Sequence, residues 1–290
     1  MSLWSERCPA KLNLYLAVTG RRQDGFHDLV SLVAQTDFGD SIEADRSHGG
    51  VDTLVCDREE LDCGPDNLVL RAAAAYRRRV PEAPYMIWNL RKRIPSGAGM
   101  GGGSSDAAAV LRLLNRVCYG ELDDAAMTEV AAEIGSDCPL FLSENSCIMR
   151  GRGELVEPLP ETVAASLRGR SVVVVKPHFG IPTPWAYGSL DRLGGFISPE
   201  AAEIELSEWM VDPSVEPPSR NSFQPPVFDK YACYGALNAV LVAAGLPELR
   251  LTGSGSACYA FAEKGRADAI ISLAGDMLGE GSFATSARLL

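Results

Sequence analysis

The order of hydrophobic and polar positions along the chain predicts a protein that mixes strands with helices. Apolar or alternating stretches without helical spacing are typical of strands. They occupy residues 11–18, 29–36, 41–44, 86–90, 172–175, 251–252 and 258–261. The stretch at 172–175 consists entirely of valine, so we expect that strand to be buried and to open a second domain.

Apolar residues with helical spacing predict four helices, and polar or glycine residues stand where these helices would begin or end. The helices are expected behind residue 66 and over residues 107–114, 127–134 and 229–244. Asp66 is placed to cap the first, and Ser104 or Ser105 the second. Gly135 and Gly245 would end the third and fourth. Residues 206–226, rich in Pro and Ser, predict a long loop, and the whole pattern indicates the α+β class.

Length and charge narrow the class of protein. With 290 residues, 46% of them hydrophobic, the chain is long enough for two ordinary domains. The formal net charge of −11 argues against nucleic acid as a partner, because such binding neutralises phosphates. A locally basic pocket could still hold a small anion. The run at residues 91–93 (Arg-Lys-Arg) is expected to be a solvated surface.

The cysteines and the apolar runs indicate the cellular compartment in which the protein works. The eight cysteines form no Cys-x-x-Cys pair, which favours small core residues in a reducing cytoplasm over disulfides or a zinc site. We expect no signal peptide, because Asn13 interrupts the short apolar run near the N-terminus. No apolar run approaches the ~20 residues of a membrane span, so no membrane partner is expected.

The strongest chemical signal is a glycine-rich stretch, residues 95–106, directly before a predicted helix. Its five glycines let backbone N–H groups turn toward a ligand, and the helix N-terminus adds unpaired donors. Together these suit a di- or triphosphate; the alternative is a tight connection without a ligand. The residues expected to hold the phosphates are Pro95, Ser96, Gly97, Ala98, Gly99, Met100, Gly101, Gly102, Gly103, Ser104 and Ser105.

The loop does not match the common phosphate loops fully. No Gly-Lys-Ser/Thr follows, so it is not a Walker A loop. Gly97, Gly99 and Gly102 satisfy G-x-G-x-x-G, but a basic run precedes them where a dinucleotide fold has an apolar strand. A non-catalytic nucleotide-binding or oxidoreductase module therefore stays open as an alternative.

Three blocks in this order resemble the GHMP kinases, the superfamily of galactokinase, homoserine, mevalonate and phosphomevalonate kinases. They are residues 9–14 (Pro-Ala-Lys-Leu-Asn-Leu), 97–106 and 251–256 (Leu-Thr-Gly-Ser-Gly-Ser). Within the superfamily, the chain is most similar to the kinases of a cytidine-diphosphate sugar alcohol in non-mevalonate isoprenoid precursor biosynthesis. This closer match lies at residues 24–29, 66–68, 135–141, 151–154, 176–177 and 183.

The resemblance implies a two-lobed fold with ATP and Mg²⁺ as cofactors and a small cytidine diphosphate derivative as substrate. Residues 1–169 would form an ATP-binding domain like ribosomal protein S5 domain 2. Residues 170–290 would form a ferredoxin-like domain, with the active site in the cleft between the two. Whether the protein is a monomer or a homodimer is undetermined.

The resemblance also implies roles for single residues. Asp137 matches the catalytic base, although its sequence position equally fits a helix N-cap. Lys11 would keep that carboxylate ionised and stabilise developing charge, and Asn13 would contact substrate or orient Lys11. The Ser105 hydroxyl could touch Mg²⁺. The other residues implied to bind substrate are Phe26, His27, Thr183, Tyr187, Gly253 and Ser254.

An imidazole can pair with the edge of a pyrimidine while an aromatic ring stacks on its face, which is the role implied for His27, Phe26 and Tyr187. The alternative is that Phe26 is a core residue and His27 a satisfied loop histidine. Three positions depart from the family: Phe26 replaces a tyrosine, Val33 a stacking phenylalanine of some members, and Ser222 an aspartate. An altered acceptor, such as homoserine or a galactose-like sugar, therefore stays open.

Overall fold

The computed structural model describes residues 4–290, and their contacts form two compact units. Unit 1 comprises residues 4–10, 38–94 and 101–144, and unit 2 comprises residues 11–37, 95–100 and 145–290. Two long strands, β1 (Trp4–Arg21) and β2 (His27–Arg46), supply residues to both. The strands predicted at 29–36 and 41–44 are thus one strand. The division into domains at residue 169 stays a prediction.

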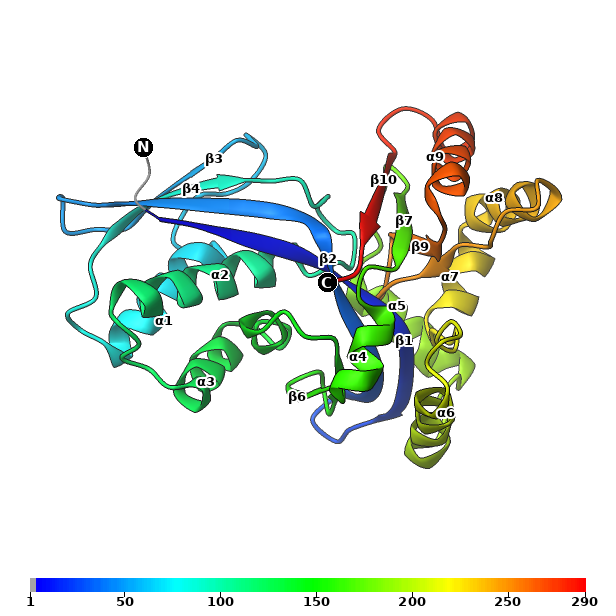
Figure 1. Cartoon of the computed structure of the whole chain (residues 1–290), viewed down its shortest axis with the longest axis horizontal. Coiled ribbons are helices and arrows are strands. Elements are labelled where there is room, and N and C mark those ends of the chain that lie inside the picture. The colour runs from blue at the N-terminus through cyan, green and yellow to red at the C-terminus, as the bar shows by residue number, and fades with distance from the viewer. Residues whose placement is uncertain (1–3) are drawn as a thin grey trace. The chain divides into compact units, whose positions relative to one another are not determined.

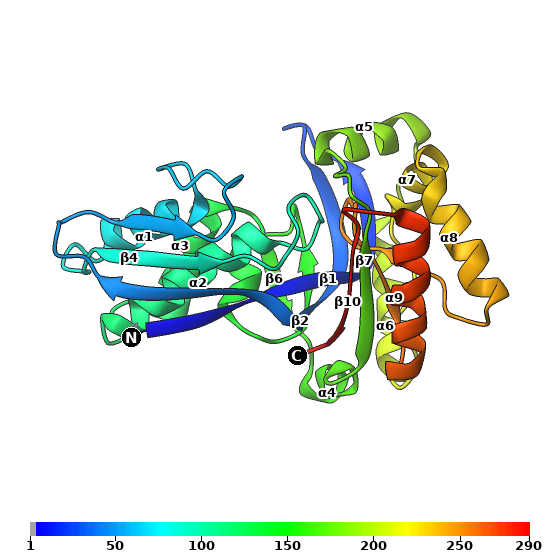
Figure 2. The same ribbon diagram turned by 90° about the horizontal axis from the view of Figure 1, so that it is seen from above.

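Unit 1 packs helices on one face of a small sheet (Figures 1 and 2). The end of β2 pairs antiparallel with β4, with Ser41 opposite Arg91, and β3 pairs parallel with β4. The elements are β3 (Thr53–Cys56), α1 (Leu68–Arg79), β4 (Met86–Arg91), α2 (Gly102–Val117), α3 (Asp124–Ile134) and the short 3₁₀ helix η1 (Pro139–Leu142). Of these, β3 and η1 were not predicted.

The alternation in β4 explains which face of this sheet the helices cover. Met86, Trp88 and Leu90 are buried, whereas Ile87 between them is exposed. Because successive strand residues point to opposite faces, the three buried side chains share one face. They belong to the same hydrophobic core as Tyr76 of α1.

Two helix starts in unit 1 differ from the prediction. Asn67, not Asp66, caps α1: its side chain accepts a hydrogen bond of 3.0 Å from the Val69 N–H. Gly101, in the left-handed region at φ 70°, precedes α2, so Ser104 lies inside that helix and caps nothing. The predicted stop of α3 at Gly135 is confirmed.

Unit 2 contains a four-stranded antiparallel sheet in the order β10-β7-β9-β8, with α8 and α9 on one side of it (Figures 1 and 2). Its strands are β7 (Ser171–Lys176), β8 (Arg250–Leu251), β9 (Cys258–Phe261) and β10 (Phe283–Arg288). The four valines of β7 are buried, as predicted, because β7 is an inner strand of this sheet. Separately, Ser31–Val33 of β2 pair with β5 (Cys147–Arg150), which pairs with β6 (Leu155–Pro158).

The helix predicted over residues 229–244 is two helices. The six helices of unit 2 are α4 (Glu161–Leu167), α5 (Thr183–Leu193), α6 (Pro199–Val211), α7 (Gln224–Lys230), α8 (Ala232–Ala243) and α9 (Lys264–Leu278). Tyr231 separates α7 from α8 in a non-helical conformation, and its ring stacks on Phe179 at 4.9 Å. The loop predicted at 206–226 is also wrong in part, because α6 continues to Val211 from an N-cap at Ser198.

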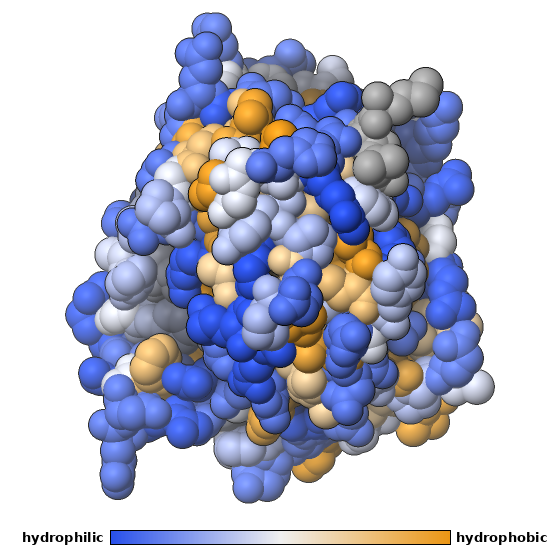
Figure 3. All heavy atoms as spheres, turned by 90° about the vertical axis from the view of Figure 1, so that its left-hand side faces the viewer, coloured by the Kyte–Doolittle hydropathy of each residue, from blue (hydrophilic) through white to orange (hydrophobic). Residues whose placement is uncertain are grey.

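All eight cysteines are free thiols, and four of them are buried, as expected for small core residues. In the part of the chain that the structure describes, no helix has both the length and the apolar character to cross a membrane. The face drawn in Figure 3 exposes mostly hydrophilic residues, with hydrophobic ones in small groups. The α+β class predicted from the sequence is confirmed.

Candidate active site

The first half of the glycine loop, residues 95–100, lies in unit 2 against the Gly-Ser-Gly-Ser turn. The carbonyl of Gly97 accepts from the Ser256 N–H at 3.3 Å, and that of Ala98 accepts from the Ala257 N–H at 3.1 Å. These bonds join segments that lie more than 150 residues apart in the sequence. Main-chain hydrogen bonds therefore join the second and third sequence blocks.

Glycine is required where these two loops approach each other most closely. A Cβ at Gly99 would lie 2.9 Å from the carbonyl oxygens of Thr252 and Gly255, and a Cβ at Gly253 would lie 2.9 Å from the Gly99 carbonyl. Both glycines also have positive φ, 76° and 56°. Any side chain here would push the loops apart, which explains the glycines of both blocks.

The first block joins the same assembly through its backbone. The Lys11 N–H donates to the Met100 carbonyl at 3.0 Å, and the Asn13 N–H donates to Thr252 Oγ1 at 2.9 Å. Strand β1 thus contacts both the glycine loop and the third block. Parts of all three blocks that carry the family resemblance, residues 11–14, 97–100 and 251–256, therefore meet within unit 2.

The Lys11 side chain is buried and held by Asn13. Lys11 Nζ donates to Asn13 Oδ1, while Asn13 Nδ2 donates to Ser31 Oγ at 2.8 Å. The Ser31 hydroxyl in turn donates to the Tyr15 carbonyl at 2.6 Å. Because Ser31 fixes the amide, the Asn13 oxygen faces the ammonium, so Asn13 orients Lys11 in this structure.

The second half of the glycine loop forms the start of α2 in unit 1. No side chain in the described chain caps this helix, and its first turn carries no acidic residue. The N–H groups of Gly102 and Gly103 are consequently unpaired donors at the positive end of the helix dipole. This end of α2 fits a phosphate group.

A buried lysine between two carboxylates stands beside this helix start. Lys92 Nζ forms ion pairs with Asp40 Oδ2 and, at 2.7 Å, with Asp106 Oδ2. Asp40 Oδ1 also accepts from the backbone N–H groups of Arg93 and Ile94. The prediction of a solvated surface at 91–93 is wrong for Lys92, whose side chain is only 9% exposed. The cluster ties the strand before the glycine loop to the first turns of α2.

The two carboxylates of this cluster are not equivalent. Asp40 receives three donors, whereas Asp106 receives one and its Oδ1 has no hydrogen-bond partner in the described chain. Burial raises the pKa of the Asp106 carboxyl to about 7, with Lys92 opposing and the charge of Asp40 adding to the rise. Burial lowers the pKa of Lys92, but the charges of Asp106 and Asp40 outweigh it, so the net shift is upward.

We expect the Asp106→Asn substitution to flatten the dependence of stability on pH. Asp106 holds its proton to a higher pH in the folded protein than in the unfolded chain. Its protonation therefore favours folding, and this contribution is lost as the pH rises through about 7. Relative to the variant, the wild type should lose up to about 2 kcal/mol between pH 5 and pH 8. Urea unfolding of both proteins at several pH values measures this difference; parallel curves would contradict it.

Asp137 lies in unit 1, half-buried in the turn between α3 and η1. The Cys138 N–H closes this turn on the Gly135 carbonyl at 3.1 Å. Cys138, not Asp137, is the residue that precedes η1, and the Cys138 side chain forms no capping hydrogen bond with it. The N-cap alternative for Asp137 is therefore not what the structure shows.

Helix α5 brings two predicted substrate residues to other predicted ones in unit 2. Thr183 Oγ1 lies 3.0 Å from Ser254 Oγ. One turn further on, the Tyr187 ring stacks on His27, with centroids 4.6 Å apart and an interplanar angle of 28°. The stacking of Tyr187 on a pyrimidine stays a prediction, because one face of this ring lies against His27.

Phe26 is the most exposed ring of this group. It lies 53% exposed after a turn at Gly25, whose φ of 86° favours glycine. The guanidinium of Arg152 sits over the ring at 4.7 Å from its centroid. Phe26 is thus a surface ring and not a core residue, with one face covered by a cation.

Two of the three departures from the family lie inside the protein. Val33 is fully buried in β2, opposite Cys147 of β5. Ser222 is 9% exposed, and its hydroxyl accepts from the Val18 N–H at 3.0 Å. Beside it, the Asn221 amide donates to the Gly253 carbonyl at 3.0 Å and so supports the turn of the third block.

Sequence reasoning missed Asp191, which contacts the predicted residue His27, and the pair of Lys92 and Asp40 beside the start of α2. Asp191 pairs with His27 at 2.7 Å. The one available signal was its spacing of four residues from Tyr187 on a helix that had not been predicted.

The structure leaves the magnesium role of Ser105 a prediction. Its hydroxyl is fully buried and has no hydrogen-bond partner in the described chain. The Ser105 oxygen therefore still has a lone pair available for a ligand. Among residues 4–290 no group of three or more His, Cys, Asp or Glu could hold a metal ion. Magnesium in nucleotide sites is usually held by phosphates and one or two protein groups, which requires no such cluster.

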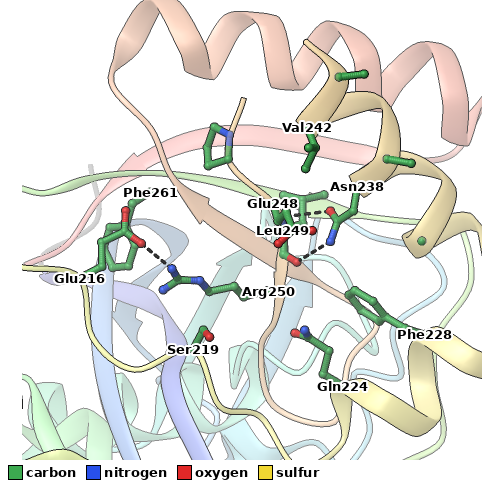
Figure 4. Close-up of a pocket in the computed structure, with 14 residues that line it drawn as sticks. Glu216, Ser219, Gln224, Phe228, Asn238, Val242, Glu248, Leu249, Arg250 and Phe261 are labelled. Carbon is green, nitrogen blue, oxygen red and sulfur yellow. Dashed lines mark hydrogen bonds and ion pairs between the residues drawn. The ribbon is translucent and has the colours of Figure 1, made fainter. Parts of the chain in front are cut away.

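A separate hollow of about 800 Å³ lies in unit 2 beside α8 and β8, and contains none of the predicted residues (Figure 4). Two of its polar side chains already have partners. Asn238 exchanges hydrogen bonds with the backbone of Leu249, and Arg250 pairs with Glu216.

Comparisons with known proteins agree with this geometry. The family described as GHMP kinases N terminal domain matches residues 67–145. A homoserine kinase from Cytophaga hutchinsonii has the same fold, with a TM-score of 0.69 at 13% identity over 100% of this chain and 96% of that one. The fold and the three converging blocks define this protein as a GHMP kinase.

The particular family follows from closer relatives. The 4-diphosphocytidyl-2-C-methyl-D-erythritol kinase of Synechococcus sp. (strain CC9311) is 38% identical, over 95% of this chain and 92% of its own length. That of Geobacter sulfurreducens (strain ATCC 51573 / DSM 12127 / PCA) is 31% identical, over 98% of both chains. A crystal structure of 4-(cytidine 5'-diphospho)-2C-methyl-D-erythritol kinase gives a TM-score of 0.78 at 30% identity, covering 98% of this chain and 99% of that one. The chain belongs to the 4-diphosphocytidyl-2-C-methyl-D-erythritol kinase family.

Proposed function

We propose that this protein transfers the γ-phosphoryl group of ATP to the 2-hydroxyl of 4-diphosphocytidyl-2-C-methyl-D-erythritol, in non-mevalonate isoprenoid precursor biosynthesis. The observation that carries the proposal is the convergence of β1, the glycine loop and the Gly-Ser-Gly-Ser turn in unit 2. A cytoplasmic location is part of the proposal and fits eight free thiols.

Phosphoryl transfer requires little covalent chemistry from the protein. It depends mainly on positioning the two substrates and on stabilising the charge of the transferred group. We assign the nucleotide phosphates to the glycine loop, residues 95–105, through those of its backbone N–H groups that are unpaired, and the acceptance of the hydroxyl proton to Asp137. Lys11, oriented by Asn13, stabilises charge that develops during transfer. Magnesium, when bound with ATP, neutralises charge on the phosphates, and Ser105 is the proposed protein contact.

The substrate end is assigned to unit 2. His27 and Phe26 would hold the cytosine ring, one at its edge and one at its face. Thr183, Gly253 and Ser254 would contact the rest of the substrate, since Thr183 and Ser254 already lie side by side. These assignments rest on the family resemblance and on the contacts described above.

An acceptor panel tests the proposal. ADP release is measured with Mg²⁺-ATP and 4-diphosphocytidyl-2-C-methyl-D-erythritol, homoserine, galactose or mevalonate, each against a no-acceptor control. We expect turnover with the cytidine substrate and background rates with the others. Turnover with homoserine or a sugar instead would show that the enzyme uses a different acceptor. The differences from the family pattern at Phe26 and Val33 would then explain that change. Titration calorimetry with ATP and with NAD tests the alternative of a non-catalytic nucleotide-binding or oxidoreductase module. Binding of NAD without binding of ATP would support that alternative.

A further inference from the structure

One face of α5 carries three side chains that contact the proposed substrate region. Thr183, Tyr187 and Asp191 are spaced four residues apart, so they lie above one another on the helix. Thr183 contacts Ser254, and both Tyr187 and Asp191 contact His27. The helix thus supports His27 from two positions.

The contact between His27 and Asp191 is short and sheltered. His27 Nε2 lies 2.7 Å from Asp191 Oδ1, with side-chain exposures of 6% and 24%. The second carboxylate oxygen, Oδ2, lies 3.5 Å from Arg21 Nη1, whose side chain is 60% exposed. Each oxygen of Asp191 therefore has one partner, and the sheltered one is the imidazole.

This contact decides which nitrogen of His27 carries the proton. An ionised carboxylate can only accept, so Nε2 must donate, and in the neutral imidazole Nδ1 is then an acceptor. No described residue hydrogen-bonds to Nδ1. Although the His27 side chain is only 6% exposed, Nδ1 is not completely buried and so keeps some access to solvent.

Aromatic packing on the His27 ring restricts its rotation. Tyr187 stacks on His27 at 4.6 Å, and Phe196 lies tilted against it at 6.0 Å. A flip of the imidazole would exchange Nε2 for a carbon at the Asp191 contact while the ring stays enclosed. Asp191 and Tyr187 together fix both the proton and the orientation of the ring.

We propose that Asp191 is a positioning residue for base selection: it holds the His27 proton on Nε2, so that Nδ1 accepts a hydrogen bond from the 4-amino group of cytosine. Uracil carries a carbonyl oxygen at that position, which would face the Nδ1 lone pair without a proton between them. This inference rests on the proposed function and adds to it a reason for preferring cytosine over uracil.

The kinetic test compares the cytidine substrate with its uridine analogue. For wild type, Asp191→Asn and Asp191→Ala, kcat/KM is measured with each base. Asparagine keeps the volume but can donate or accept, so it permits both tautomers of His27. We expect the cytidine-to-uridine ratio to fall about tenfold or more in both variants, with the KM for ATP unchanged. Asp28→Asn is the matched control, because it removes a carboxylate that follows His27 in the sequence, is 44% exposed and pairs with Arg22.

A spectroscopic test in the free protein is independent of activity. The chain has three histidines, so ¹⁵N-histidine NMR resolves them, and His27→Gln identifies the His27 signals. We expect a protonated Nε2 and an unprotonated Nδ1 in wild type and in Asp28→Asn, and a mixture of tautomers in Asp191→Asn. A His27 tautomer that is the same in Asp191→Asn as in wild type would overturn the inference.

The two tests separate this inference from the proposed function. An unchanged base ratio in the Asp191 variants overturns the role of Asp191 while leaving the kinase assignment intact. If the wild type does not act on the cytidine substrate at all, the proposed function fails, and base selection by this enzyme fails with it. In that case the NMR result still decides whether Asp191 fixes the His27 tautomer.

Discussion

Replacing Asp137 with asparagine is expected to lower kcat by roughly 10²–10⁴, the usual contribution of a general base. The amide keeps the size of the side chain but cannot accept the proton of the substrate hydroxyl. Because the nucleotide is assigned to the glycine loop, the KM for ATP should change little. Steady-state kinetics with saturating cytidine substrate and varied ATP measures both quantities.

A matched control is available in the same unit. Asp124, an exposed residue at the start of α3, can be changed to asparagine with the same loss of charge. That variant should keep wild-type kcat. Wild-type turnover in Asp137→Asn would instead show that Asp137 has no catalytic role and only forms part of the turn. A double-mutant cycle with Lys11→Met then asks whether Lys11 and Asp137 act in the same step, in which case their effects are not additive.

Replacing Lys92 with methionine is expected to destabilise unit 1 by about 3–5 kcal/mol, because the buried carboxylates of Asp40 and Asp106 lose their shared cation. Methionine keeps most of the length and apolar volume of lysine, so little of the loss comes from packing. Hydrogen–deuterium exchange, peptide by peptide, measures the effect in residues 38–94 and 101–144. Unit 2 serves as the internal reference.

The neighbouring basic residue provides the control for this substitution. Arg91 stands one position earlier, with a side chain 67% exposed, and forms a long 3.8 Å ion pair with Glu43. Arg91→Met should therefore cost less than about 1 kcal/mol. Adding Asp106→Asn to Lys92→Met should recover part of the stability, since one buried charge is then removed. Equal effects at positions 91 and 92 would show that burial of the Lys92 cluster does not matter.

The glycine loop and its partners could be recognised from the sequence because their signals are local. Glycine density at residues 97–103 predicted backbone donors before a helix, and α2 does begin at Gly102. The sequence could not show why Gly99 must be glycine. That reason is the carbonyls of Thr252 and Gly255, which come from a loop some 150 residues away.

Lys92 shows where local patterns fail. Within Arg-Lys-Arg all three residues look alike, and only Lys92 meets two carboxylates, one of them 52 positions earlier in the chain. Its burial is a property of the tertiary structure. The same holds for Tyr231, which interrupts a continuous helical pattern because its ring packs on Phe179.

Helix α5, which carries Asp191, could have been predicted. Proline stands in its first turn and Gly194, in the left-handed region, follows its last residue, which are the usual start and stop signals. Gly188 in its interior obscured the pattern. Once the helix is drawn, the spacing of Thr183, Tyr187 and Asp191 places them on one face.

The most direct measurement is ³¹P NMR of the protein with Mg²⁺-ATP and 4-diphosphocytidyl-2-C-methyl-D-erythritol. A new phosphomonoester resonance on the substrate, formed in step with ADP and absent without enzyme, is the predicted result. ATP that stays intact, or is hydrolysed to inorganic phosphate while the substrate spectrum does not change, would contradict the assignment.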